Sequence, residues 1–116
     1  LIRIINRKFS YNTADRVLTY IKLVLNRLEI EPTIKIKIYK ELNRVVNNIF
    51  NSNLKIRLLG KNPRNIAGAL TYIYLKSYGI EINLSTISSI LSTSLFTLRD
   101  YVRKLSNLIT YAQGIS

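Results

Sequence analysis

With 116 residues, of which 47% are hydrophobic, the chain can form one domain around one core. It has no Cys and no His, which excludes a disulfide framework, a zinc ribbon, a thiol nucleophile and Ser–His catalysis. The 18 Lys and Arg outnumber the 6 Asp and Glu, and the net charge of +12 favours nucleic acid as a partner over an anionic membrane surface, an acidic protein or no charged partner at all.

The chain starts with a basic, apolar stretch that has no helical periodicity. We therefore expect residues 1–11 to form a basic linker or arm. Asn12 or Thr13 can cap a helix over residues 13–29. The apolar stripe of this helix contains Val17, Ile21, Val24 and Leu28 at spacings of three and four.

The next stretch fits two structures. Residues 33–39 alternate between apolar and polar like a half-buried strand, whereas Ile34, Ile38, Leu42, Val45 and Ile49 recur at helical spacing. A single strand would have no second strand to pair with in this chain. We therefore expect a helix over residues 33–50, followed by a loop over 51–62.

A third helix has clear signals at both ends. Asn62 is expected at the N-cap, Pro63 at the first helical position and Gly79 just beyond the C-terminus. Gly68 and Ala69 are small enough to let another helix approach closely.

Two helices close the chain. A short one is capped by Asn83, and a turn over residues 92–94 leads into the last helix, whose core stripe is Leu95, Leu98, Val102, Leu105 and Ile109. Residues 111–116 are expected to fray. The prediction is an all-α chain of five helices, in which residues 83–109 have the pattern of a helix-turn-helix.

The last helix carries the residues expected to bind DNA. Arg99 can read a guanine, Phe96 can pack on a thymine methyl, and Arg103 is better placed for a phosphate. Further backbone contacts are expected from Lys61, Arg64, Lys104 and Ser94, and the helix start beside Lys61 offers free N–H groups to phosphate. The hydroxyls of Ser85, Thr86, Ser88 and Ser89 fit either phosphate contact or packing against a neighbouring helix. In the structural alternative, Arg99 pairs with an acidic neighbour or faces water, and Phe96 lies in the core.

Three segments resemble a known family. Residues 60–73 (GKNPRNIAGALTYI) and 97–105 (TLRDYVRKL) resemble two motifs of the second cyclin-like repeat of archaeal transcription factor B, the relative of eukaryotic TFIIB. Tyr20 to Leu28 is similar to the first helix of that repeat, so the resemblance covers about residues 12–109. The chain departs from the family at Tyr101, which is one place early, at Ser92, where the family usually has Gly, and at Phe96, which replaces a smaller Val.

The resemblance implies a five-helix cyclin-like domain over residues 12–110, ending in the helix-turn-helix. It implies a general initiation factor that binds promoter DNA with the TATA-binding protein, reads DNA upstream of TATA and helps to recruit RNA polymerase. By position, the base-reading Arg of the family falls on Arg99 and its apolar contact on Phe96. The alternatives are a cyclin-fold protein-interaction module and a stand-alone or viral helix-turn-helix regulator.

Several expected absences complete the prediction. Six scattered carboxylates form no recognisable acid/base pair, so we expect no enzyme activity, catalytic residue, cofactor or metal. The longest uncharged window, residues 82–98, contains eight Ser or Thr and is too polar to span a membrane. We expect a cytoplasmic protein at the archaeal nucleoid, or a nuclear one in a eukaryote. Because the chain begins with Leu1 and not Met, we also expect a domain of a longer protein.

Overall fold

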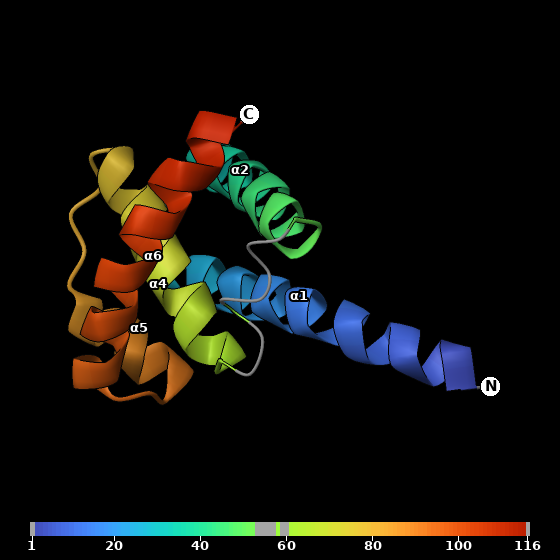
Figure 1. Cartoon of the computed structure of the whole chain (residues 1–116). Coiled ribbons are helices and arrows are strands. Elements are labelled where there is room, and N and C mark those ends of the chain that lie inside the picture. Colours follow the sequence, from blue (N-terminus) through green and yellow to red (C-terminus); the bar gives the residue numbers. More distant parts are fainter. Residues whose placement is uncertain (1, 53–57, 59–60, 116) are drawn as a thin grey trace.

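The computed structural model describes the backbone of residues 2–52, 58 and 61–115, and the side chains of residues 13–52, 58 and 61–109. These residues form five α-helices and no strand, as expected for an all-α chain (Figure 1). The helices are α1 (Ile2–Arg27), α2 (Pro32–Phe50), α4 (Pro63–Ser77), α5 (Leu84–Leu91) and α6 (Leu95–Ile115). Among the described residues, none of these helices is long and apolar enough to cross a membrane.

Helix α4 lies at the centre of the fold and contacts α1, α2, α5 and α6. Residues 65–71 are all buried, so α4 is covered on every side, unlike a surface helix with one apolar stripe. Gly68 makes this packing possible. A Cβ at that position would lie 2.8 Å from Leu91 Cδ1 on α5 and 3.0 Å from Leu98 Cδ1 on α6. The expected close approach of another helix at Gly68 is therefore confirmed.

Both ends of α4 follow the sequence prediction. Asn62 is the N-cap, and its Oδ1 accepts a hydrogen bond of 2.9 Å from the backbone N–H of Arg64. At the other end the N–H of Gly79 donates to the carbonyl of Lys76, and the N–H of Ile80 donates to that of Leu75. This pair of bonds is a Schellman motif, which needs a left-handed residue, and Gly79 supplies it with φ of 76°.

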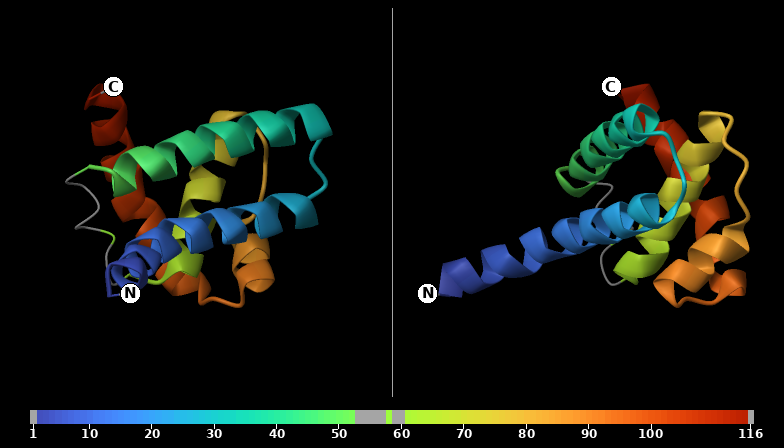
Figure 2. Two further views of the ribbon diagram at one scale, coloured as in Figure 1. Left: turned by 90° about the vertical axis from the view of Figure 1, so that its right-hand side faces the viewer. Right: turned by 180° about the vertical axis from the view of Figure 1, so that it is seen from behind.

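The predicted start of the first helix is wrong. Helix α1 begins at Ile2, so residues 2–11 are helical and Asn12 and Thr13 lie inside the helix instead of capping it. The stretch before residue 13 contains no Gly or Pro that would interrupt a helix. The N-terminal part of α1 extends away from the other helices (Figures 1 and 2).

Helix α2 confirms the helical interpretation of residues 33–50 and excludes the strand. Its buried side chains are Ile38, Leu42, Val45, Val46 and Ile49, which form one face of a helix. They pack over α1, and the two helices lie side by side in Figure 2. The alternation of apolar and polar residues over 33–39 therefore does not indicate a strand, because these residues lie in the first turns of α2.

Helices α5 and α6 form where they were predicted. Asn83 occupies the N-cap of α5, although its side chain makes no capping hydrogen bond. Ser92 ends α5 in the left-handed conformation, with φ of 55°, which reverses the chain before α6. The backbone of α6 is helical from Leu95 to Ile115.

Candidate nucleic-acid interface

Helix α6 has one buried face and one exposed face, and the predicted site residues lie on the exposed one. Leu98 and Leu105 are 0% and 3% exposed and hold the helix against the core. Phe96 is 81% exposed, and Arg99 and Arg103 are exposed as well. The three side chains follow each other at spacings of three and four, so they share one stripe of the helix. The expectation that Phe96 and Arg99 point away from the core is confirmed.

Phe96, Arg99, Asp100 and Arg103 line a shallow hollow of about 280 Å³ on this face. The site thus presents a phenyl ring and two guanidinium groups along the first three turns of α6. Guanidinium groups can bind a guanine edge or a phosphate, and a ring offers an apolar contact to a thymine methyl. These are the groups that the base-reading prediction requires.

Asp100 is the one carboxylate in this part of the surface, and it binds two cations. Its carboxylate oxygens lie 2.6 Å from Arg103 Nη2 and 3.0 Å from Lys104 Nζ. Hydrogen bonding from Lys104, and then the charge of Arg103, lower the pKa of Asp100. The pairing with an acidic neighbour that was considered for Arg99 is made by Arg103 and Lys104 instead. Because their side chains are 77% and 63% exposed, these ion pairs orient the cations without burying them.

Arg64, at the start of α4, is held against α1. Its Nε donates to Tyr20 Oη at 3.4 Å, and its guanidinium carbon lies 5.6 Å from the centre of the Tyr20 ring. The hydrogen bond from Arg64, followed by smaller effects of Arg16, lowers the pKa of Tyr20. Arg64, which is predicted to contact phosphate, therefore has an exposed guanidinium that Tyr20 helps to position. The guanidinium of Arg16 lies beside the same tyrosine.

Two of the first three positions of α4 offer no free N–H to an anion. The N–H of Arg64 already donates to Asn62 Oδ1, and Pro63 has no N–H to offer. The expectation of free N–H groups for phosphate is wrong at these two positions, because the cap uses the donor. The charge of this region comes from the side chains of Lys61 and Arg64.

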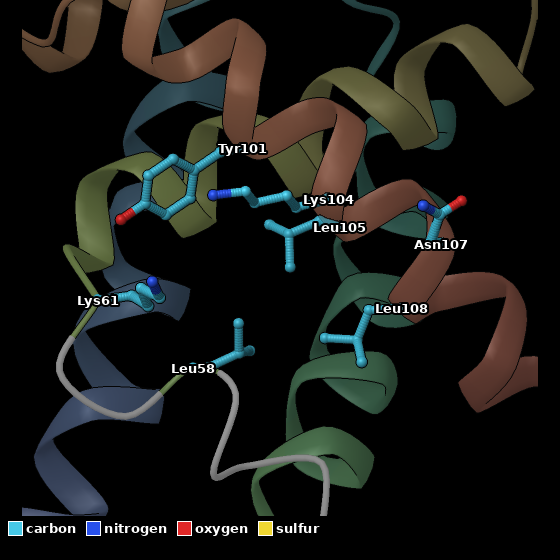
Figure 3. A pocket seen from close by; sticks show the side chains of 7 residues that line it. All are labelled: Leu58, Lys61, Tyr101, Lys104, Leu105, Asn107 and Leu108. Atoms are coloured by element: carbon cyan, nitrogen blue, oxygen red, sulfur yellow. The ribbon is translucent and has the colours of Figure 1, made fainter.

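One hydrogen bond joins this region to α6. The N–H of Asn62 donates to Tyr101 Oη at 3.4 Å. Lys61, Tyr101 and Lys104 line the same hollow, and Figure 3 shows the three side chains together on one side of it. Contacts therefore run from α1 through the start of α4 to α6. We name the cations along this path the basic strip: Arg16, Arg64, Lys61, Lys104, Arg103 and Arg99.

Two carboxylates, Glu41 and Glu81, lie near the opposite end of α4, together with Lys76. Burial, and then the neighbouring Glu41 carboxylate, raise the pKa of Tyr78. Tyr78 is the C-cap of α4, which lies about 24 Å from the N-cap at 1.5 Å per residue, and Glu81 follows it closely in the chain. The basic strip therefore lies at the N-terminal end of α4, away from Glu41 and Glu81.

The predicted hydroxyl contacts divide into two kinds. Ser94 caps α6, since its Oγ accepts from the N–H of Thr97 at 3.4 Å. Ser88 is buried and donates to the carbonyl of Ser85 at 2.9 Å, so it belongs to the packing of α5. Ser85, Thr86 and Ser89 are exposed.

Four further residues belong to this surface and were not predicted as parts of it: Arg16, Tyr20, Asp100 and Tyr101. The role of Asp100 was predictable from the sequence, because Arg103 and Lys104 follow it at the spacings of three and four that form ion pairs on a helix. Tyr20 lies 44 residues from its partner Arg64 in the chain, and Tyr101 lies 39 residues from its partner Asn62. No local sequence pattern indicates contacts between residues so far apart. Comparison with protein-family models, with curated proteins and with solved structures finds no match to this chain.

Proposed function

We propose that this chain binds duplex DNA through α6 and the basic strip. The observation that carries the proposal is the exposed stripe of Phe96, Arg99 and Arg103 on a helix whose opposite face is buried. Helix α5, the turn over residues 92–94 and α6 then act as a helix-turn-helix, with α6 in the major groove. Arg99 and Phe96 contact bases, while Lys61, Arg64, Arg103, Lys104 and Ser94 contact the phosphate backbone.

The position of the basic strip supports this orientation. Phosphates attract the end of α4 that carries Lys61 and Arg64, and the end that carries Glu41 and Glu81 faces away from the duplex. An acidic protein bound at the same surface is the competing possibility. Binding of DNA and binding of an acidic protein differ in how the affinity depends on salt, and only binding of DNA can depend on base sequence.

The test is a titration with random-sequence duplex DNA at two salt concentrations, followed by fluorescence anisotropy. Four phosphate-binding cations predict a slope of log K against log salt of roughly −3.6. The control is Arg44→Ala, which removes an exposed charge on α2 outside the basic strip and should leave the slope within about half a unit. Absence of binding at low salt, or an equal loss in Arg44→Ala and Arg103→Ala, contradicts the proposal.

We further propose that the domain is a cyclin-like repeat of a TFIIB-type initiation factor and not an enzyme. This rests on the resemblance of residues 60–73 and 97–105 to that family. It is supported by Ser92, which takes a left-handed conformation at the position where the family usually has Gly. Its partners are then promoter DNA, the TATA-binding protein and RNA polymerase, in the archaeal cytoplasm or a eukaryotic nucleus. A footprint upstream of TATA that strengthens when the TATA-binding protein is added tests this, and an unchanged footprint contradicts it.

A further inference from the structure

A hollow of about 470 Å³ opens between α6 and the start of α4. Its wall has two parts. Leu58, Leu105 and Leu108 form the apolar part, and Lys61, Tyr101 and Lys104, together with Asn107, form the polar part (Figure 3). The volume lies within the range of about 300–1,000 Å³ that is usual for small-molecule sites.

The apolar part is built from core side chains. Leu58, Leu105 and Leu108 are 4%, 3% and 5% exposed, so packing fixes their positions. They offer a ligand no hydrogen-bond donor or acceptor from their side chains. An apolar group placed against them would be removed from water.

The polar part is positive and provides donors. Lys61 and Lys104 contribute two ammonium groups, and the residues that line the hollow include no carboxylate. Tyr101 Oη accepts from the N–H of Asn62, and its own proton can still be donated to a ligand. The exposed pair between Lys104 and Asp100 is weak, so an anion can recruit Lys104 at little cost.

We propose that this hollow binds a small amphipathic organic anion, with one acidic head group on an apolar body. The head, a carboxylate or a phosphate, binds between Lys61 and Lys104 with Tyr101 as a third donor. The body packs against the three leucines. The inference does not depend on DNA binding, and its test contains no DNA.

The first experiment compares four probes by NMR titration of the protein. Octanoate and octyl phosphate carry both head and body, 1-octanol lacks the charge, and inorganic phosphate lacks the body. We expect the two amphipathic anions to bind at least about tenfold more tightly than either partial probe, because a charge-assisted hydrogen bond and the apolar contact each contribute. The ratio between octanoate and octyl phosphate identifies the preferred head group.

The second experiment uses matched variants. Lys61→Gln should weaken the binding of the preferred anion by about fivefold to tenfold. Lys76→Gln removes the same charge from the last turn of α4, outside the hollow, and should change binding less than about twofold. The amide signals of Tyr101, Leu105 and Leu108 should shift on binding.

Three results overturn the inference. They are absence of binding by both amphipathic anions, equal binding of octanoate and 1-octanol, and an equal loss of binding in Lys61→Gln and Lys76→Gln. The last result would mean that the net charge of the whole domain attracts the anion. Lys61 is exposed, so its replacement does not disturb the core, and circular dichroism verifies the fold of each variant.

Discussion

Gly68 on α4 and Leu91 on α5 approach so closely that a Cβ on the glycine would lie 2.8 Å from Leu91 Cδ1. Carbon atoms in favourable contact are about 3.5–4.0 Å apart, so a methyl group at position 68 would force the Leu91 side chain to shift. Leu98 on α6 lies nearly as close to the same point. One position on the central helix therefore sets the placement of both helices of the proposed helix-turn-helix.

Gly68→Ala should destabilise the fold. Overpacking costs about 1–3 kcal/mol, which exceeds the roughly 1 kcal/mol that alanine gains over glycine in a helix. We expect a net loss of about 1 kcal/mol in the free energy of unfolding, measured by urea denaturation. Adding Leu91→Val shortens the opposing side chain, so the double variant should lose less than the sum of the two single losses. Additive losses would show that the two residues do not compete for space.

Local patterns in the sequence were sufficient for most of the fold. The helical spacing of Ile38, Leu42 and Ile49 identified α2, and Asn62 with Gly79 located both ends of α4 within a residue. The start of α1 was not predictable in this way. Asn12 and Thr13 are good caps by residue type, but a cap forms only where the preceding residues leave the helix, and nothing in residues 2–11 forces them to.

The candidate site was predictable only as far as it depends on one helix. The helical spacing of the apolar residues Leu98 and Leu105 defines the buried face of α6, and this was enough to place Phe96 and Arg99 on the exposed face. The positions of Arg64 and Tyr101 depend on how α1, α4 and α6 pack together. Contacts of that kind arise from tertiary structure, so the continuity of the basic strip required the folded chain.

Arg99→Ala should reduce sequence preference. Loss of a bidentate contact to a base should cost about 1–3 kcal/mol on a duplex selected from a random library and much less on unselected DNA. Competition binding with selected and unselected duplexes measures the difference. Arg44→Ala, which removes a charge from α2, is the matched control. If Arg99→Ala weakens every duplex equally, Arg99 contacts only phosphate.

Lys61→Ala should weaken binding to all sequences to the same extent. Its ammonium lies in the basic strip away from the base-reading residues, so its loss should reduce the magnitude of the salt slope by about one. Anisotropy titrations at several salt concentrations give the slope. Lys76→Ala, at the opposite end of the same helix, should leave it unchanged. An unchanged slope in Lys61→Ala would remove this residue from the DNA interface.

Asp100 should titrate below its ordinary pKa of 3.8, because Lys104 and then Arg103 stabilise the carboxylate. The ion pairs therefore support the fold above about pH 4, the pKa range of an unfolded Asp, and this support is lost as the pH falls through the lowered pKa. Carboxyl ¹³C NMR measures the titration directly. Lys104→Gln should raise the pKa of Asp100 toward 3.8, while Lys76→Gln should not. A pKa of Asp100 that does not respond to Lys104→Gln would contradict the assigned cause.

Asp100→Asn should tighten the binding of duplex DNA at neutral pH. The wild-type carboxylate occupies Arg103 and Lys104 and repels phosphate, so its removal frees two cations of the basic strip and raises the local charge by one. We expect an increase in affinity of about threefold or more at low salt, together with a steeper salt slope. Asp15→Asn removes an exposed acid from α1 and is the control for net charge. If both variants tighten binding equally, the effect belongs to the whole domain, and Asp100 does not compete with DNA for the two side chains.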